Sequence, residues 1–556
     1  MTSDTDAATE ADGPANANAE KPHVSGLAWL SLLIAAAIVT SHFLQYAQQN
    51  VFYFQLKELG RFAMFMGAVA VPIWLIIGWR LGLIAAGNSA LAAAAFWVIS
   101  PYLDGTFRTV SSTLSLGVNA ALLMMSAFTL LIWLVAICFN RKTLPKGGLI
   151  ALGIFTLVFS AQNLGAFSVI AEANIDLSDT VGPEVVSPNA ISVNPSELPH
   201  VVYIVPDRYA SPRTLRKRYD LDISEFADRL RDRGFHVWDH QSANYTATFQ
   251  SVAAVMNMTY LTEAAERMGT RGQSFAPTLR LMADHRSFRA LKASGYRSLH
   301  MASWWDGNRL NPHADEVVSP YSLSGEFLWR YLFRSPIAMF APFLIESSAP
   351  AVCALYREQA EAAMTKATAD EPHFIYWHLF SVHDPYVYGA DGSCREYPSA
   401  PGVDWEERKR VYAEQIEPTN QMLVEVFDHF QGQSDRPFIF VIQSDEGPYP
   451  HGMLVNRKSY SHWHAEASDT QLKFSIFNAM YLPSGDYPDA GQQTSPINNM
   501  RYVLNEALGL DLPFMEHRHY SFDNGYKYPF EFQRIDDRLT QIDPLTAVTP
   551  DSSATE

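Results

Sequence analysis

The chain has 556 residues, of which 48% are hydrophobic, and it carries a formal net charge of −17. This length suits more than one domain, and the acidic balance argues against a protein that binds nucleic acid through a basic surface. Three cysteines are too few for a disulfide-rich scaffold or a cysteine-based zinc site. The sequence has neither a Walker A loop nor a dinucleotide-binding glycine motif, so we expect no nucleotide cofactor.

Residues 1–25 are polar and have no apolar face, which predicts a disordered cytoplasmic tail. Five apolar segments with almost no charge follow: 26–46, 62–79, 82–103, 116–139 and 148–170. Each has close to the roughly 20 residues that an α-helix needs to cross a bilayer. Residues 26–170 are therefore predicted to form a transmembrane domain of five helices.

The short loops between these segments carry the signal for orientation. With the N-terminus in the cytoplasm, the basic residues inside outnumber those outside: Lys21, Arg80, Arg141, Lys142 and Lys146 against Lys57, Arg61 and Arg108. This bias follows the positive-inside rule, and five crossings then put everything after residue 170 outside the cytoplasm. Residues 171–198 are polar and contain several prolines, as expected of a linker.

From residue 199 to residue 535, short β-rich runs alternate with amphipathic segments of helical period. The predicted strands are the runs HVVYIV, YRSLHMA, HFIYWHLF, RPFIFVIQS and FSIFNAMYLP, and predicted helices include 222–235 and 405–430. This alternation is typical of an α/β domain in which helices sandwich a mainly parallel sheet. Residues 536–556 are predicted to be a second disordered tail.

Polar residues directly follow several of these strands, at the end of the sheet where α/β proteins bind ligands. Asp207 ends the first strand, His383 follows the run HFIYWHLF, and Asp445 with Glu446 ends the run RPFIFVIQS, while Thr248 begins a predicted helix. Converging carboxylates make an oxygen-rich pocket for a divalent cation, which can activate a nearby hydroxyl group. Taken singly, each of these residues is equally well a helix cap, an ion-pair partner or a loop residue.

Five segments in a fixed order carry a family resemblance: VVYIVPDRY, SANYTATFQSVAAVMNMTYL, HLFSVHDPYVY, FVIQSDEGP and SPINNMRYVLNEALG. They make residues 199–530, with the preceding membrane segments, similar to the alkaline phosphatase and sulfatase superfamily. Within it, the chain resembles the membrane-anchored sulfatase-like hydrolases and transferases, the branch that contains lipoteichoic acid synthase and phosphoethanolamine transferases. The resemblance implies an alkaline phosphatase-like fold for a periplasmic domain of a multi-pass protein in the bacterial inner membrane.

The resemblance also implies roles for single residues. Thr248 matches the nucleophile, with Ser251 at the companion position and Thr246 as a less favoured candidate. His383 matches the histidine that helps to bind the substrate phosphate or the leaving group. These roles imply a covalent phospho-threonine intermediate.

For the metal, the resemblance assigns Asp207, Thr248 and Asp445 as ligands, and Glu446 stands where the family has a ligating histidine. A glutamate there makes an all-oxygen site, which favours one manganese or magnesium ion, or calcium, over zinc. Three histidines follow soon after and either supply a nitrogen ligand or belong to an exposed loop: His451, His462 and His464.

The implied function is a metal-dependent transferase that moves a head group of phosphoglycerol or phosphoethanolamine type from a membrane phospholipid to an envelope glycan or glycolipid. The apolar stretch 331–345 is either a segment that docks on the bilayer or an ordinary core helix. Two other functions stay open. One is a periplasmic phosphodiesterase or phosphomonoesterase with the same site; the other is a degenerate, non-catalytic binding or scaffold protein, which the departure at Glu446 favours.

The cysteines bear on two further questions. The formylglycine route of type I sulfatases needs a Cys-x-Pro-x-Arg context, and Cys353 is followed instead by Ala-Leu-Tyr-Arg. We therefore do not expect sulfate ester hydrolysis by that route. Cys353 and Cys394 can pair if this part of the chain is extracytoplasmic, and both the paired and the free state remain open.

Overall fold

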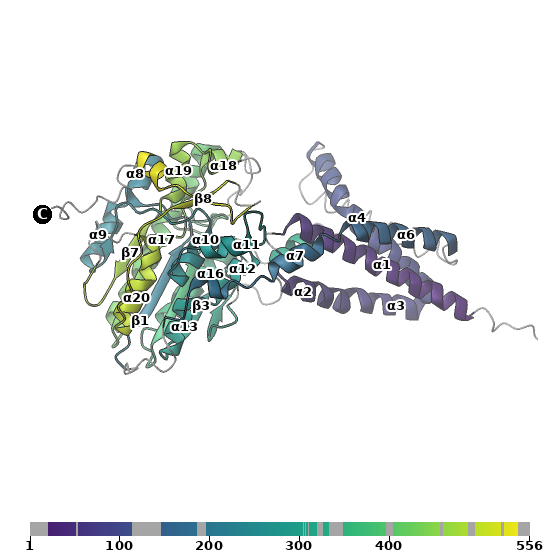
Figure 1. Cartoon of the computed structure of the whole chain (residues 1–556), viewed down its shortest axis with the longest axis horizontal. Helices are drawn as coiled ribbons and strands as arrows, with labels where there is room; N and C mark the ends of the chain where they lie inside the picture. Colours follow the sequence, from purple (N-terminus) through teal and green to yellow (C-terminus); the bar gives the residue numbers. More distant parts are fainter. Residues whose placement is uncertain are drawn as a thin grey trace, which may run out of the picture. The chain divides into compact units, whose positions relative to one another are not determined.

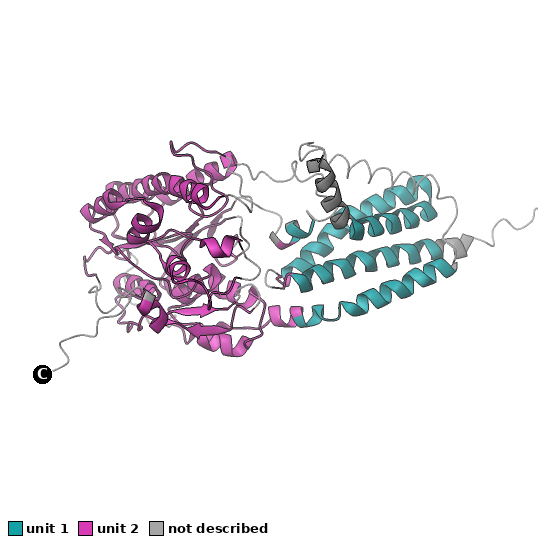
Figure 2. Cartoon of the chain, turned by 90° about the horizontal axis from the view of Figure 1, so that it is seen from above, with its two compact units in different colours: residues 1–49, 57–168, 328–344 teal, residues 50–56, 169–327, 345–556 magenta. Residues whose placement is uncertain are grey.

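The computed structural model divides the chain into two compact units (Figures 1 and 2). The first unit comprises residues 1–49, 57–168 and 328–344, and the second comprises residues 50–56, 169–327 and 345–556. The residues that the structure describes are 21–51, 54–113, 146–185, 196–303, 305, 307–309, 311–319, 326–332, 349–395, 404–455, 460–487, 495–523 and 528–542.

The first unit consists of apolar helices. They are α1 (Lys21–Gln49), α2 (Lys57–Phe65), the π-helical turn η1 (Met66–Ala70), α3 (Val71–Leu81), α4 (Leu83–Thr113), α6 (Lys146–Gln162) and the start of α7 (Ala166–Ala173). Trp29 on α1 and Trp74 on α3 pack with their ring centroids 4.9 Å apart. Large apolar side chains also point outward, and Trp79 and Leu157 are 79% and 71% exposed. Apolar surface on this scale suits helices that face lipid.

The number of membrane-crossing helices differs from the prediction. In the described part of the chain, two helical stretches are long and apolar enough to cross a membrane, Gly26–Gln49 and Lys57–Leu81. The stretches Gly147–Gln162 and Ala166–Ala173 add a third if this pair, which is bent by 43°, forms one span. The predicted segment 82–103 falls on α4, whose apolar part, Leu83–Ile99, is shorter, and segment 116–139 lies outside the described residues. The described helices therefore support two or three of the five predicted crossings.

A segment from late in the sequence belongs to the first unit. In α14 (Glu326–Leu332), Tyr331 is buried, and its hydroxyl accepts a hydrogen bond from Trp97 Nε1 at 2.9 Å. Its ring lies 5.2 Å from that of Phe43 and 6.0 Å from that of Phe62. The predicted apolar stretch 331–345 thus begins inside this helical unit, and its residues 333–345 lie outside the described part of the chain.

The second unit is built on a sheet of seven strands. They are β1 (His200–Pro206), β2 (His236–Val237), β3 (Arg297–Met301), β4 (Glu316–Val318), β5 (His373–Leu379), β6 (Phe438–Gln443) and β7 (Asn478–Tyr481). Their order is β2-β7-β6-β1-β5-β3-β4. Neighbours from β6 to β4 are parallel, and β7 pairs antiparallel with both β6 and β2. The sheet is therefore mixed, with the predicted parallel arrangement in its central strands.

Helices cover both faces of this sheet, as the α/β pattern predicts. Alternate side chains of β1 enter opposite cores: Val201, Tyr203 and Val205 one, Val202 and Ile204 the other. The first core is completed by α10 (Thr248–Asn257), α11 (Thr262–Met268), α12 (Ala276–Ala283), α13 (Arg286–Ala293) and α20 (Asn499–Leu508). The second is completed by α8 (Pro212–Tyr219), α9 (Ser224–Asp232), α16 (Ala349–Met364) and α17 (Trp405–Gln433). Burial of aliphatic and aromatic side chains in both cores, at about 1.5–3 kcal/mol each, stabilises the sandwich.

The end of the chain is more ordered than predicted. Residues Asp536–Ile542 form helix α21, and Leu539 packs in a small core with Phe474, at the end of α19 (Ala467–Phe474), and Ile535. The prediction of a disordered tail from residue 536 is therefore wrong for this helix, because one buried leucine anchors a segment that is otherwise polar. Residues 543–556 lie outside the described part of the chain.

Candidate metal centre

Three neighbouring strands bring Asp207, His378 and Asp445 together. Strands β5 and β6 flank β1, and all three are parallel, so their carboxyl ends lie at one edge of the sheet. His378 on β5 is in register with Val205 on β1, and the backbone N–H of Asp207 donates to the carbonyl of Leu379 at 2.9 Å. The side chains of Asp207, His378 and Asp445 each offer a ligand atom, and these atoms lie within 4.8 Å of one another.

This group of three is buried, and several of its polar atoms have no hydrogen-bond partner among the described residues. These atoms are Asp207 Oδ1, Asp445 Oδ2 and both ring nitrogens of His378. Buried polar atoms in proteins are normally paired, and carboxylate oxygens that converge with an imidazole nitrogen suit a divalent cation. The group therefore has the donor atoms and the geometry to hold a divalent metal ion.

The pKa shifts of the two carboxylates also favour a bound cation. Burial raises the pKa of Asp445 to about 7, and the nearby charges of Asp207 and Glu446 add to the rise. Burial also acts to raise the pKa of Asp207, but His383, His378 and Arg208 outweigh it and hold that pKa below its ordinary value. A cation between the two carboxylates would remove the repulsion between them.

Thr248 is the hydroxyl that joins this group. It is the first residue of α10, and its side chain lies beside Asp445, where it acts to lower the pKa of that carboxyl group. The N-terminus of this helix favours negative charge, which suits a phosphate beside the hydroxyl. Ser251, the predicted companion, instead donates to the carbonyl of Tyr245 at 3.1 Å. The Thr246 hydroxyl is buried and has no hydrogen-bond partner in the described structure.

Glu446 lies in an ion-pair network. The sequence predicts it among the metal ligands, but it is not one of the three residues whose ligand atoms converge. Its Oε1 atom is 3.0 Å from Arg208 Nε and 2.8 Å from Lys473 Nζ. All three side chains are buried, and the Arg208 guanidinium also lies 3.4 Å above the ring of Tyr449. Two buried cations need an anion nearby, and Glu446 supplies it.

His383 lies beside the group, in the loop after β5. Its ring Nδ1 donates a hydrogen bond to the carbonyl of Asp384, and in its protonated form the ring acts to lower the pKa of Asp207. Burial and the positive charge of Arg208 lower the pKa of His383 to about 4, so its ring is neutral at pH 7. The Asp384 carboxylate is held by Arg408 at 2.5 Å.

The three later histidines do not join the group. His462 is buried, donates its backbone N–H to Asp523, and packs edge-on against Phe522. His451, at the start of α18 (His451–Val455), and His464 line a separate cavity. The nitrogen atoms within the group belong to His378, which the sequence analysis did not single out. The available signal was a polar residue inside the apolar run HFIYWHLF, on the strand next to Asp207.

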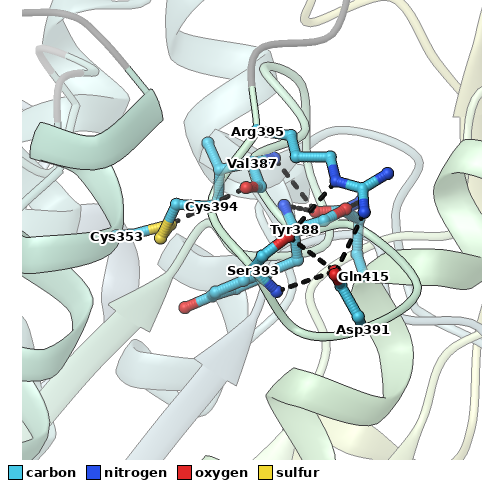
Figure 3. Close-up of a disulfide and its surroundings, with 8 residues drawn as sticks. All are labelled: Cys353, Val387, Tyr388, Asp391, Ser393, Cys394, Arg395 and Gln415. Carbon is cyan, nitrogen blue, oxygen red and sulfur yellow. Dashed lines mark hydrogen bonds and ion pairs between the residues drawn. A yellow bond between two sulfur atoms is a disulfide. The ribbon is translucent and has the colours of Figure 1, made fainter.

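A disulfide closes the loop that follows His383 (Figure 3). Cys353 on α16 is bonded to Cys394, 41 residues later, with their Cα atoms 6.3 Å apart. Gln415 on α17 supports the same loop, because its Oε1 accepts from the N–H groups of Val387 and Tyr388 at 3.0 and 2.8 Å. The paired state, left open by the sequence, is thus the one in the structure. The disulfide tethers the loop to α16, and Gln415 tethers it to α17.

Comparisons with known proteins extend over this unit. The family model described as Sulfatase matches residues 199–493. No curated protein matches the sequence. The integral membrane lipooligosaccharide phosphoethanolamine transferase A from Neisseria meningitidis is similar in structure, at 12% identity over 86% of this chain and 95% of that chain, with a TM-score of 0.37.

Two further solved structures are similar to a comparable degree. One is the C-terminal periplasmic domain of EcEptC from Escherichia coli in complex with Zn, at 12% identity over 57% of this chain and 84% of that one, with a TM-score of 0.37. The other is the lipoteichoic acid synthase LtaP from Listeria monocytogenes, at 14% identity over 64% and 93% of the two chains, with a TM-score of 0.36.

Proposed function

The chain belongs to the sulfatase family, and from this premise we propose that it is a membrane-bound, metal-dependent transferase that moves a phosphorylated head group. The donor is a membrane phospholipid with a head group of phosphoglycerol or phosphoethanolamine type, and the acceptor is a hydroxyl group of an envelope glycan or glycolipid. The observation that carries the proposal is the buried group of Asp207, His378 and Asp445, with the side chain of Thr248 beside Asp445.

The reaction has two balanced steps. In the first, Thr248 Oγ1 forms a bond to phosphorus, the bond from phosphorus to the oxygen of the lipid alcohol breaks, and the threonine proton ends on that alcohol. In the second, the acceptor hydroxyl bonds to phosphorus, the Thr248 ester breaks, and the acceptor proton returns to Thr248. The ring of His383 is neutral at pH 7 and donates from Nδ1 to the Asp384 carbonyl, so its Nε2 carries no proton and can accept one from a hydroxyl group of the substrate.

The donor set bears on the metal. Asp207, His378 and Asp445 would hold the ion with Thr248, and the ion would lower the pKa of the hydroxyl and offset charge on the phosphate. The expected preference for manganese or magnesium, or calcium, over zinc rested on an all-oxygen site. Because His378 adds a nitrogen donor, we propose that the ion is manganese, as expected, or zinc.

The charge count of the centre supports a phosphodiester as donor. Asp207, Asp445 and Glu446 together bring three negative charges, and Arg208 with Lys473 brings two positive ones. A bound dication leaves one positive charge, which matches the single negative charge of a phosphodiester better than the two of a phosphomonoester. This favours head-group transfer, or diester hydrolysis, over phosphomonoester hydrolysis.

The location of the domain is also part of the proposal. We place it on the outer, periplasmic side of the inner membrane, tethered by the apolar helices of the first unit. The disulfide between Cys353 and Cys394 supports this side, because such bonds persist in oxidising compartments.

The test uses the full chain in detergent, with manganese and a phospholipid labelled in its head group. Wild type should transfer the label to a glycan acceptor, and peptide mass spectrometry should find the trapped phosphoryl group on Thr248. Thr248→Ala should abolish both the transfer and the trapped phosphoryl group. Ser251→Ala should keep both, because the Ser251 hydroxyl of the wild type is bonded to a backbone carbonyl. Label on Thr246 would refute the assignment of the nucleophile, and label released only as free head group would make the enzyme a hydrolase.

A further inference from the structure

A second cavity lies in the second unit, apart from the group that could hold a metal. Its volume is about 640 Å³, and Asp207, His378 and Asp445 do not line it. Its principal lining residues come from α8, α17, α18 and the segment before α19: Lys217, Arg218, Trp405, Lys409, His451 and Tyr460. Figure 1 marks α8, α18 and α19 at one end of this unit.

Exposed positive charge lines the cavity. Lys217 and Arg218 are exposed and form no close ion pair within the part of the chain that the structure describes, and Arg218 acts at longer range on the carboxylate of Asp469. The third cation, Lys409, is paired with Glu406 at 2.7 Å. Of the two acids in the lining, Asp469 accepts a hydrogen bond from the Gly452 backbone, and Glu466 is exposed. In a chain with a net charge of −17, two adjacent exposed cations on a concave surface, neither in a close ion pair among the described residues, suit an anionic ligand.

The other side chains suit a sugar ring. Trp405 and Tyr460 present flat apolar faces, and Trp405 is held against His451 with the ring centroids 5.4 Å apart. Such faces pack against the C–H face of a saccharide, while Asp469, His451 and His464 can bond to its hydroxyl groups. A pocket of this kind combines apolar walls with a few polar groups that fix the orientation of the ligand.

The cavity is connected to the metal centre through short stretches of chain. His451 lies six residues after Asp445 in the sequence. Leu472 lines the cavity, and the next residue, Lys473, reaches Glu446 at 2.8 Å. The backbone N–H of Gly447 donates to the carbonyl of Lys473 at 2.9 Å. A ligand in the cavity therefore touches the same two segments that hold the centre.

We propose that this cavity binds a negatively charged saccharide and holds the acceptor for the transfer. The anionic group lies at Lys217 and Arg218, and a sugar ring packs on Trp405. The role as acceptor site rests on the proposed function, whereas binding of the saccharide does not.

The test is calorimetric titration of the full chain in detergent with glucose 6-phosphate, in the Thr248→Ala background so that no turnover occurs. Glucose and inorganic phosphate are titrated separately. We expect glucose 6-phosphate to bind at least about tenfold more tightly than either. The double change Lys217→Gln, Arg218→Gln should weaken its binding by about tenfold or more. Trp405→Ala should weaken the binding of glucose 6-phosphate but leave the binding of inorganic phosphate unchanged.

A matched control separates this site from general surface charge. Arg216→Gln removes a cation of the same helix that pairs with Asp239 and does not line the cavity, so binding should not change. The proposal would be overturned if the double variant of Lys217 and Arg218 bound glucose 6-phosphate as tightly as the protein without these changes. It would also be overturned if inorganic phosphate bound as tightly as glucose 6-phosphate. Tight binding of glucose 6-phosphate, together with a wild-type protein that transfers no head group, would refute only the proposed function.

Discussion

Asp445 and Glu446 are neighbours in the sequence, yet the fold gives their carboxylates different partners. Asp445 faces Asp207 and His378, where repulsion and burial raise its pKa to about 7. Glu446 faces Arg208 and Lys473, which balance its charge. A single peptide step thus separates a carboxylate that suits a metal ion from one that is already paired.

This difference predicts opposite effects of two substitutions. Asp445→Asn should reduce the metal content of the purified full chain to near zero, because it removes a charged ligand. Glu446→Gln should keep the metal but lower the stability of the domain by about 3–5 kcal/mol, because two buried cations lose their partner. Elemental analysis and thermal unfolding check both. Loss of metal from the Glu446→Gln protein, with folding intact, would restore Glu446 as a ligand.

The sequence predicted part of this site for a clear reason. Asp207, Asp445 and His383 follow strands whose apolar character is unmistakable, and parallel strands bring their ends together. His378 could not be found this way, because a histidine within an apolar strand is usually a core residue. The partners of Glu446 were equally hidden, since Lys473 is 27 positions away and reaches it only through the fold.

Among the elements, the loop from His383 to Cys394 depends most on a covalent bond. Opening a 41-residue loop in the unfolded chain accounts for about 4 kcal/mol in the chain-entropy model. The double change Cys353→Ser, Cys394→Ser should therefore lower stability by about 2–4 kcal/mol and slow transfer, because His383 loses its tether. Unfolding with and without a reductant is the measurement. A wild-type protein indifferent to the reductant would contradict the prediction.

A second element-scale prediction concerns α21. Asp536 accepts from His519 Nδ1 at 2.8 Å, and the opposite ring nitrogen of His519 is 2.7 Å from Ser242 Oγ. Burial acts to raise the pKa of Asp536, but its bonds to His519 and Arg534 outweigh burial and lower the pKa to about 2. The pKa of Asp536 is lower in the folded than in the unfolded chain. The charged carboxylate therefore stabilises the folded state above about pH 4, and this stabilisation is lost as the pH falls towards 2.

Asp536→Asn should therefore lower the free energy of unfolding by about 2 kcal/mol at pH 7 and by almost nothing at pH 2. Urea unfolding of the wild type and the variant across this range measures the difference. A difference that stays constant with pH would mean that the bonds of Asp536 do not depend on its charge. The sequence did not predict this helix, because a short acidic segment with one buried leucine has the composition of a tail.

For the whole molecule, the order of segments along the chain matters. The first unit takes in residues 328–344, and the second takes in residues 50–56. A fragment of residues 169–556 would therefore expose Tyr331, which is 1% exposed in the full chain. We expect this fragment to self-associate in detergent-free buffer, and Tyr331→Ser to reduce the association. Light scattering of both fragments is the measurement, and a monodisperse unmodified fragment would refute the expectation.

This exchange of segments also sets the timing of biosynthesis. His42 and Tyr331, whose side chains lie 3.2 Å apart, are separated by 289 positions in the sequence. The early helices must therefore wait in the bilayer while the ribosome makes the first part of the following domain, at about 5–20 residues per second. For many seconds the aromatic side chains of Phe43, Phe62 and Trp97 lack the Tyr331 ring that packs on them in the folded chain. During that interval an insertase or chaperone could bind to this exposed aromatic surface.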